Sequence, residues 1–96
     1  MLQFVIIAED GADDAALERR MAARPAHLEV AGNLKSAGNY VLGGAMLNDA
    51  GKMTGSVMIV QFETEAALNE WLSREPYITG KVWQNIQVKP FKVADV

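Results

Sequence analysis

The single histidine of the chain, His27, is the residue best suited to acid–base chemistry. A histidine side chain accepts or releases a proton near neutral pH, so it can act as a general acid or a general base. Small alanines at positions 23, 26 and 31 surround it in the sequence and would leave room for a ligand beside the ring. On the sequence alone, the simpler interpretation is a partly buried histidine that is hydrogen-bonded to backbone groups.

Glu75 is the carboxylate that could act with this histidine. It follows the predicted end of a helix and precedes Pro76, a position from which a carboxylate can reach a neighbouring element. A carboxylate beside an imidazole fixes its tautomer and the orientation of its ring. The alternative, a solvated loop acid, is far more common for an isolated glutamate.

The remaining candidates would bind a ligand rather than transfer protons. Arg20 and Arg24 lie four residues apart and could bind an anionic substrate, although solvated or ion-paired arginines are more usual. The Gly43 and Gly44 pair would let a ligand approach a strand closely, or would mark a bend. Tyr77 could line a pocket or simply pack.

Composition excludes several kinds of site. The 96 residues include no cysteine, so disulfides and thiolate catalysis are excluded, and one histidine is too few for a His-rich metal site within one chain. Nine scattered Lys and Arg residues with a net charge of -3 offer no basic surface for nucleic acid or an anionic membrane. No apolar run approaches the ~20 residues of a membrane span. We expect no metal, no cofactor and a cytoplasmic location.

The rest of the chain predicts the elements that position these side chains. Asp13 is a candidate cap for a first helix, and Pro25 predicts a kink or a restart within it. Gly38 suits the left-handed position after that helix, and Thr64 suits the cap of a second helix ending near Arg74. Residues 48–52 have the composition of a hairpin turn. Strands are predicted at residues 2–8, 40–47, 56–62 and 82–93.

The predicted order is β-α-β-β-α-β, which is the ferredoxin-like pattern of the α+β class. It consists of a four-stranded antiparallel sheet with both helices on one face. Right-handed connections would make the first and third strands the central pair. We expect one domain spanning residues 1–96.

The two central strands lack the alternation that a sheet with one wet face should have. Residues 4–7 and 57–60 are apolar throughout, so the face away from the helices also needs cover. A second copy of the chain would supply that cover, giving a homodimer packed sheet against sheet. The alternative is that these strands tolerate scattered exposed apolar groups.

Several segments together resemble the YCII-related (YciI-like) family. The strand run at residues 4–7 looks like the family's opening, and residues 24–28 resemble its histidine-bearing helix. The segment from Gly38 to Gly43 and Gly44 resembles the part of the family in which a helix is followed by a glycine, a strand and a further glycine. Residues 75–77 with Gly80 resemble its Asp-Pro-aromatic segment. Their order and spacing make the resemblance specific, and it covers nearly the whole chain.

This resemblance implies a dimeric α+β barrel with a pocket near the histidine and the acid. Family members of known activity include a dehydrochlorinase, in which a His-Asp pair is associated with acid–base work. By position, His27 would be the general acid or base and Glu75 its orienting partner. The chain departs from the family at this acid, since aspartate is usual there. Glutamate keeps the charge and adds one methylene, so it either reaches the histidine from a shifted position or turns to solvent.

Two functions follow from these observations. The first is a cofactor-independent lyase or isomerase acting on a small anionic substrate that is cyclic or bears an enol. The second is a non-catalytic dimer that binds a small ligand or serves as an accessory protein. The distance between the His27 imidazole and the Glu75 carboxylate, and a cavity beside them, would discriminate between the two.

Overall fold

The computed structural model describes residues 1–96, which form four strands and three helices. The elements follow one another as β-α-β-β-α-α-β, which is the predicted order with one short extra helix. Their bounds are β1 Leu2–Asp10, α1 Ala16–Ser36, β2 Tyr40–Leu47, β3 Met53–Phe62, α2 Glu65–Arg74, α3 Pro76–Thr79 and β4 Trp83–Phe91.

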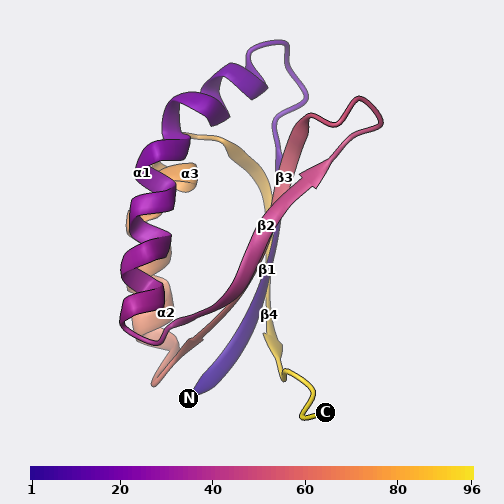
Figure 1. Cartoon of the computed structure of the whole chain (residues 1–96). Coiled ribbons are helices and arrows are strands. Elements are labelled where there is room, and N and C mark those ends of the chain that lie inside the picture. Colours follow the sequence, from indigo (N-terminus) through magenta and orange to yellow (C-terminus); the bar gives the residue numbers. More distant parts are fainter.

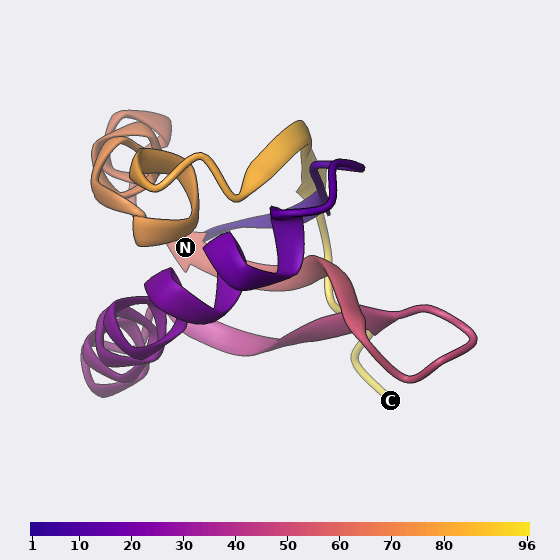
Figure 2. The same cartoon turned by 90° about the horizontal axis from the view of Figure 1, so that it is seen from above.

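The strands form one antiparallel sheet in the order β2-β3-β1-β4. The prediction of a ferredoxin-like sheet with the first and third strands in the centre is therefore confirmed. All three helices lie on one face of this sheet, as Figures 1 and 2 show from two directions. The hairpin between β2 and β3 extends away from the helices (Figures 1 and 2). Its turn has the predicted composition, with a backbone hydrogen bond from Asn48 to Lys52 and a positive φ of 76° at Gly51.

The core lies between the helices and the sheet. Alternate residues of the two central strands point to the helices and are buried, as the two-residue period of a strand requires. Trp71 of α2 and Leu34 of α1 complete this core from the helix side. The core members from β1 and β3 are Phe4, Ile6, Ala8, Met58, Val60 and Phe62.

Helix α1 is one continuous helix, so the predicted restart at Pro25 is wrong. Proline removes one backbone donor, which leaves the carbonyl group of Met21 without its helical partner. Both residues lie on the exposed side of the helix, where water satisfies such a carbonyl group. The helix therefore continues through the proline. As predicted, Gly38 follows its end with a positive φ of 79°.

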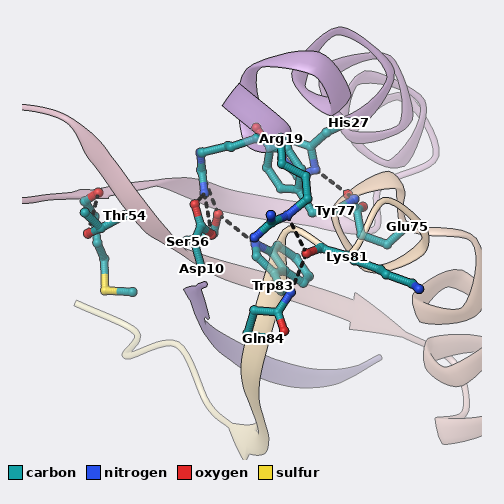
Figure 3. Close-up of polar contacts among 12 residues, drawn as sticks. Asp10, Arg19, His27, Thr54, Ser56, Glu75, Tyr77, Lys81, Trp83 and Gln84 are labelled. Carbon is teal, nitrogen blue, oxygen red and sulfur yellow. Dashed lines mark hydrogen bonds and ion pairs between the residues drawn. The ribbon is translucent and has the colours of Figure 1, made fainter. Parts of the chain in front are cut away.

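The predicted helix cap at Asp13 is also wrong. The N-terminal capping position is Ala15, which makes no side-chain capping bond. Instead, the Asp13 carboxylate accepts two hydrogen bonds from Arg19, at 2.9 and 3.0 Å. This guanidinium holds the pKa of Asp13 well below its ordinary value, at about 2. Arg19 also donates to the backbone oxygen of Lys81, so it joins the start of α1 to the segment that precedes β4 (Figure 3).

The segment before β4 contains an element that the sequence did not indicate. Thr64 caps α2 as predicted, accepting a hydrogen bond from the backbone N–H of Ala67 at 3.1 Å, and α2 ends at Arg74 as predicted. Pro76 then opens the one-turn helix α3, because proline suits the first position of a helix. This turn packs against α1 and brings Glu75 and Tyr77 into the interior.

The sheet face away from the helices carries a block of apolar side chains. Val5 pairs with Ile59 and Ile7 pairs with Val57, so these four half-buried residues form a contiguous patch. Leu42 of β2 pairs with Ile59 on the same face and is 53% exposed. No element of the chain covers this face (Figure 1). None of the helices combines the length and the apolar character that crossing a membrane requires.

Candidate functional site between α1 and the sheet

One stripe of α1 faces the sheet with three cationic or titratable side chains. Arg20, Arg24 and His27 follow one another at intervals of four and three residues, which places them on the same side of a helix. Arg20 is 2% exposed, and the His27 side chain is 12% exposed. Helix geometry alone therefore brings these three groups to one interior surface.

The predicted contact between histidine and glutamate is present. Nδ1 of His27 lies 2.5 Å from Oε1 of Glu75, whose side chain is fully buried (Figure 3). A carboxylate oxygen is an acceptor, so it selects the tautomer in which Nδ1 carries the proton. Nε2 makes no hydrogen bond within the chain and is not sealed from solvent. The arrangement leaves Nε2 with a free lone pair, as a general base requires.

Glu75 is fixed from its own side as well. Its Oε1 also accepts a hydrogen bond from the backbone N–H of Tyr77 at 3.1 Å, so the side chain caps α3. The longer glutamate therefore does not turn to solvent. Its Oε2 is buried without a hydrogen-bond partner. The glutamate thus fixes both the histidine ring and the turn that carries Tyr77.

The ring of Tyr77 contacts both ends of the α1 stripe. It stacks on the His27 imidazole with 3.9 Å between centroids and 13° between planes. The Arg20 guanidinium carbon lies 4.6 Å from the centroid of the same tyrosine ring, a cation–π contact. Burial raises the pKa of the Tyr77 phenol above its ordinary value, while the charges of Arg20 and Arg24 act in the opposite direction.

Arg20 is held by groups from the central strands. Its Nη1 donates to both carboxylate oxygens of Asp10, at 3.0 and 3.1 Å, and its Nη2 donates to Oγ of Ser56 at 2.9 Å. The indole Nε1 of Trp83 donates to the same Ser56 oxygen at 3.2 Å. This buried cluster connects α1, β1, β3 and β4, and Figure 3 labels its members Asp10, Ser56 and Trp83. It fixes the inner wall of the site.

A cavity of about 70 Å³ lies between α1 and the sheet. It is partly open to solvent and is bordered there by Leu28, which is 49% exposed. The volume is below the roughly 150 Å³ of an apolar cavity known to hold benzene. A ring-shaped ligand would therefore extend from this cavity into its mouth. The polar side chains around the cavity are those of Arg20, Arg24, His27, Tyr40, Ser56 and Tyr77.

The structure brings together five of the six candidate residues from the sequence. Arg24 borders the cavity and makes no hydrogen bond or ion pair with the chain, so its guanidinium is free to bind an anion. Gly44 also borders the cavity, whereas Gly43 does not. A side chain at Gly43 would lie 2.8 Å from the Tyr40 hydroxyl, so this glycine makes room for that tyrosine.

The sequence leaves anion binding, solvation and ion pairing open for Arg20, and the structure shows the ion pair, with Asp10. Arg20 lies seven residues before His27 and so shares its helix stripe. Two further residues of the site, Asp10 and Ser56, are not singled out by the sequence. Asp10 and Ser56 carry no comparable signal, since their pairing depends on the strand register. No cluster of acidic and histidine side chains is arranged to hold a metal ion.

Comparisons with known proteins agree with this architecture. The chain matches the family described as "YCII-related domain" over residues 2–92. It is 39% identical over 95 residues to a protein named YciI from Escherichia coli O6:H1 (strain CFT073), covering 93% of this chain and 95% of that protein.

Two solved structures share the fold. The 5-chloro-2-hydroxyhydroquinone dehydrochlorinase TftG from Burkholderia phenoliruptrix AC1100, in complex with 2,5-dihydroxybenzoquinone, superposes with a TM-score of 0.81 at 24% identity, covering 96% of this chain and 95% of that chain. A dimeric ferredoxin-like protein of unknown function from Jannaschia sp. CCS1 gives a TM-score of 0.59 at 14% identity, covering 97% and 100%. At these identities the likeness concerns the fold alone. The family match and the relative from Escherichia coli show that this chain belongs to the YCII-related family.

Proposed function

We propose that the chain binds a small anionic molecule, cyclic or enol-bearing, and acts on it as a cofactor-independent lyase or isomerase. The observation that carries this proposal is the 2.5 Å contact that fixes Nδ1 of His27 on the buried Glu75 carboxylate and leaves Nε2 free beside a cavity. The structural similarity to a dehydrochlorinase supports the lyase class by analogy of fold only.

The proposed chemistry is a proton transfer at Nε2. In this scheme Nε2 of His27 removes a proton from a C–H or O–H group of the substrate, and Glu75 holds the imidazolium that forms. In an elimination, the electron pair freed by this step expels the leaving group as an anion. In an isomerisation, the proton returns from Nε2 to another carbon atom. Arg24 binds the negative charge of the substrate at the mouth, and Tyr77 and Gly44 border the bound ring.

We further propose that the chain works as a homodimer joined through its bare sheet face. Val5, Ile7, Val57 and Ile59 form a contiguous apolar patch there, and polar residues of β4, Gln87 and Lys89, border it in register. A surface of this kind is typical of a protein–protein contact. One of the solved structures with this fold is a dimer, which is consistent with the proposal.

A second candidate is a non-catalytic ligand-binding or accessory dimer. The small volume of the cavity favours it, because about 70 Å³ does not enclose a ring within one chain. In that case His27 would serve as a hydrogen-bonding group for the ligand, and no turnover would occur.

The proposal is tested with 2,5-dihydroxybenzoquinone as a binding probe and with a panel of halogenated and unhalogenated cyclic enols as substrates. His27→Ala should lower turnover by about 10²–10⁴-fold, the usual contribution of a general acid or base. Glu75→Gln should also lower turnover, because an amide does not stabilise the imidazolium. Glu70→Gln is the matched control, since Glu70 is exposed on α2 and pairs only with Arg74 at the surface.

The outcomes separate the two candidates. Turnover that is lost in His27→Ala and kept in Glu70→Gln supports the acid–base mechanism. Binding of the probe without turnover of any substrate supports the ligand-binding alternative. Full activity of His27→Ala on an identified substrate rejects the mechanism.

A further inference from the structure

We propose that the hydroxyl group of Ser56 donates a hydrogen bond to the ligand, which therefore presents an oxygen acceptor, such as an enolate or carboxylate oxygen, to the centre of the sheet. This inference rests on the proposed function, because it adds a binding residue to the same cavity. It also narrows the ligand, which must carry an acceptor oxygen at its inner end as well as negative charge near Arg24.

The hydrogen bonds of Ser56 leave only one role open to it. A serine hydroxyl group offers one donor and two acceptor lone pairs. Its Oγ receives one hydrogen bond from Arg20 at 2.9 Å and one from the indole of Trp83 at 3.2 Å, which together use both lone pairs. No acceptor in the chain takes the hydroxyl proton of Ser56. The remaining capacity of this side chain is therefore to donate.

The Ser56 hydroxyl group borders the cavity, so a ligand there can accept its hydrogen bond. Ser56 is 2% exposed, lies on the helix-facing side of β3 and borders the cavity together with His27. Its neighbours in register are Ala8 on β1 and Ala45 on β2. Because both neighbours on the adjacent strands are alanines, no larger side chain from β1 or β2 in this register covers the Ser56 hydroxyl group at the floor of the cavity.

The charges around Ser56 favour a negative acceptor. Arg20 is a permanent cation, and the carboxylate of Asp10 holds it in place with two contacts of 3.0 and 3.1 Å. A hydroxyl oxygen that accepts from a cation becomes a stronger donor, because hydrogen bonds in a chain polarise one another. The donor is also fixed in orientation before the ligand arrives, which is how a preorganised site stabilises an oxyanion.

The first experiment measures the dissociation constant of 2,5-dihydroxybenzoquinone by calorimetry for the wild-type protein and for Ser56→Ala. Loss of a hydrogen bond to an anionic acceptor should raise this constant by about 10- to 100-fold. Ser73→Ala is the matched control, because the Ser73 hydroxyl is exposed on α2 and donates only to the Glu70 backbone oxygen. It should bind the probe as the wild-type protein does. A Ser56→Ala constant within twofold of wild type overturns the inference.

The same titrations distinguish failure of this inference from failure of the proposed function. If the wild-type protein does not bind the probe, the proposed ligand class is rejected and the role of Ser56 with it. The inference alone is rejected by a different result, in which the wild-type protein binds the probe, His27→Ala weakens that binding and Ser56→Ala leaves it unchanged.

A second experiment uses the wild-type protein, because Ser56→Ala also leaves Arg20 and Trp83 without an acceptor and could disturb the fold. The chain has two tryptophans, and their indole N–H signals are separate probes in a proton NMR spectrum. Trp83 donates to Ser56, whereas the buried Nε1 of Trp71 has no partner. When the probe accepts from Ser56, the Trp83 signal should move downfield and the Trp71 signal should stay. A Trp83 signal that is unchanged at saturation overturns the inference.

Discussion

The side chains of the site are held from more than one direction. Glu75 fixes the histidine ring and also caps α3, and Asp10 and Ser56 fix the guanidinium of Arg20. The contact of His27 with Glu75 and that of Arg20 with Ser56 join elements that are distant in the sequence. Interactions of this kind keep reactive groups in one geometry before a ligand binds.

Tyr77 predicts a measurable pH dependence. Its folded-state pKa is raised by burial, so its neutral form contributes stability that is fully present below the ordinary tyrosine pKa of about 10 and is lost as pH rises through the folded value. The unfolding free energy of the wild-type protein should therefore fall more steeply above about pH 10 than that of Tyr77→Phe. Urea denaturation across this range checks the prediction. Parallel curves for the two proteins would contradict the prediction.

At this scale the sequence predicts the acid–base pair better than its surroundings. His27 and Glu75 were found because a lone histidine and an acid before Pro76 are conspicuous by residue type. For Arg20 the sequence left anion binding and ion pairing open, because the burial that decides between them does not follow from residue type. Ser56 was missed because its importance lies in hydrogen bonds from two other elements.

At the scale of elements, local signals predicted the bounds where they agreed with the tertiary packing. β2 has the predicted bounds, and α2 begins after Thr64 and ends at Arg74 as expected. The incorrect predictions concern positions at which the tertiary structure outweighs the local sequence preference. Asp13 is used by Arg19 rather than by the helix, and α1 continues through Pro25 because that side of the helix meets water.

The interrupted hydrogen bond in α1 predicts a stabilising substitution. Pro25→Ala restores a backbone donor within the helix, so the unfolding free energy should rise by about 1–2 kcal/mol. Urea denaturation followed by circular dichroism measures the change. Thr64→Ala is a reference in the same assay, since it removes a capping bond and should cost about 1 kcal/mol. Pro25→Ala that is no more stable than wild type would mean that α1 depends on the geometry of the proline.

At the scale of the whole molecule, the unequal faces of the sheet are the main feature. One face is covered by three helices (Figures 1 and 2). The other presents the patch of Val5, Ile7, Val57 and Ile59. The sequence already indicated this patch, because its central strands do not alternate. The sequence of one chain predicts that this apolar face must be buried. It does not predict which surface buries it, because that depends on the assembly.

The proposed dimer predicts the effect of a charge within this patch. Ile59→Lys places a cation between Val5 and Leu42 in register, so burial against a second copy would become unfavourable. Sedimentation velocity should show a dimer for the wild-type protein and a monomer for this variant. Asn33→Lys, which adds the same charge on the exposed side of α1, should remain dimeric. A wild-type protein that is monomeric at micromolar concentration contradicts the dimer.

The proton position on His27 tests the central claim most directly. The chain has one histidine, so the nitrogen-15 NMR spectrum of a uniformly labelled sample contains one pair of imidazole signals. In the neutral form of the ring, the account predicts a proton on Nδ1 and a bare Nε2. It also predicts that the Nε2 signal shifts when the binding probe chosen for the proposed function saturates the site. A proton on Nε2, or an Nε2 signal that the saturated site leaves unchanged, would contradict the account.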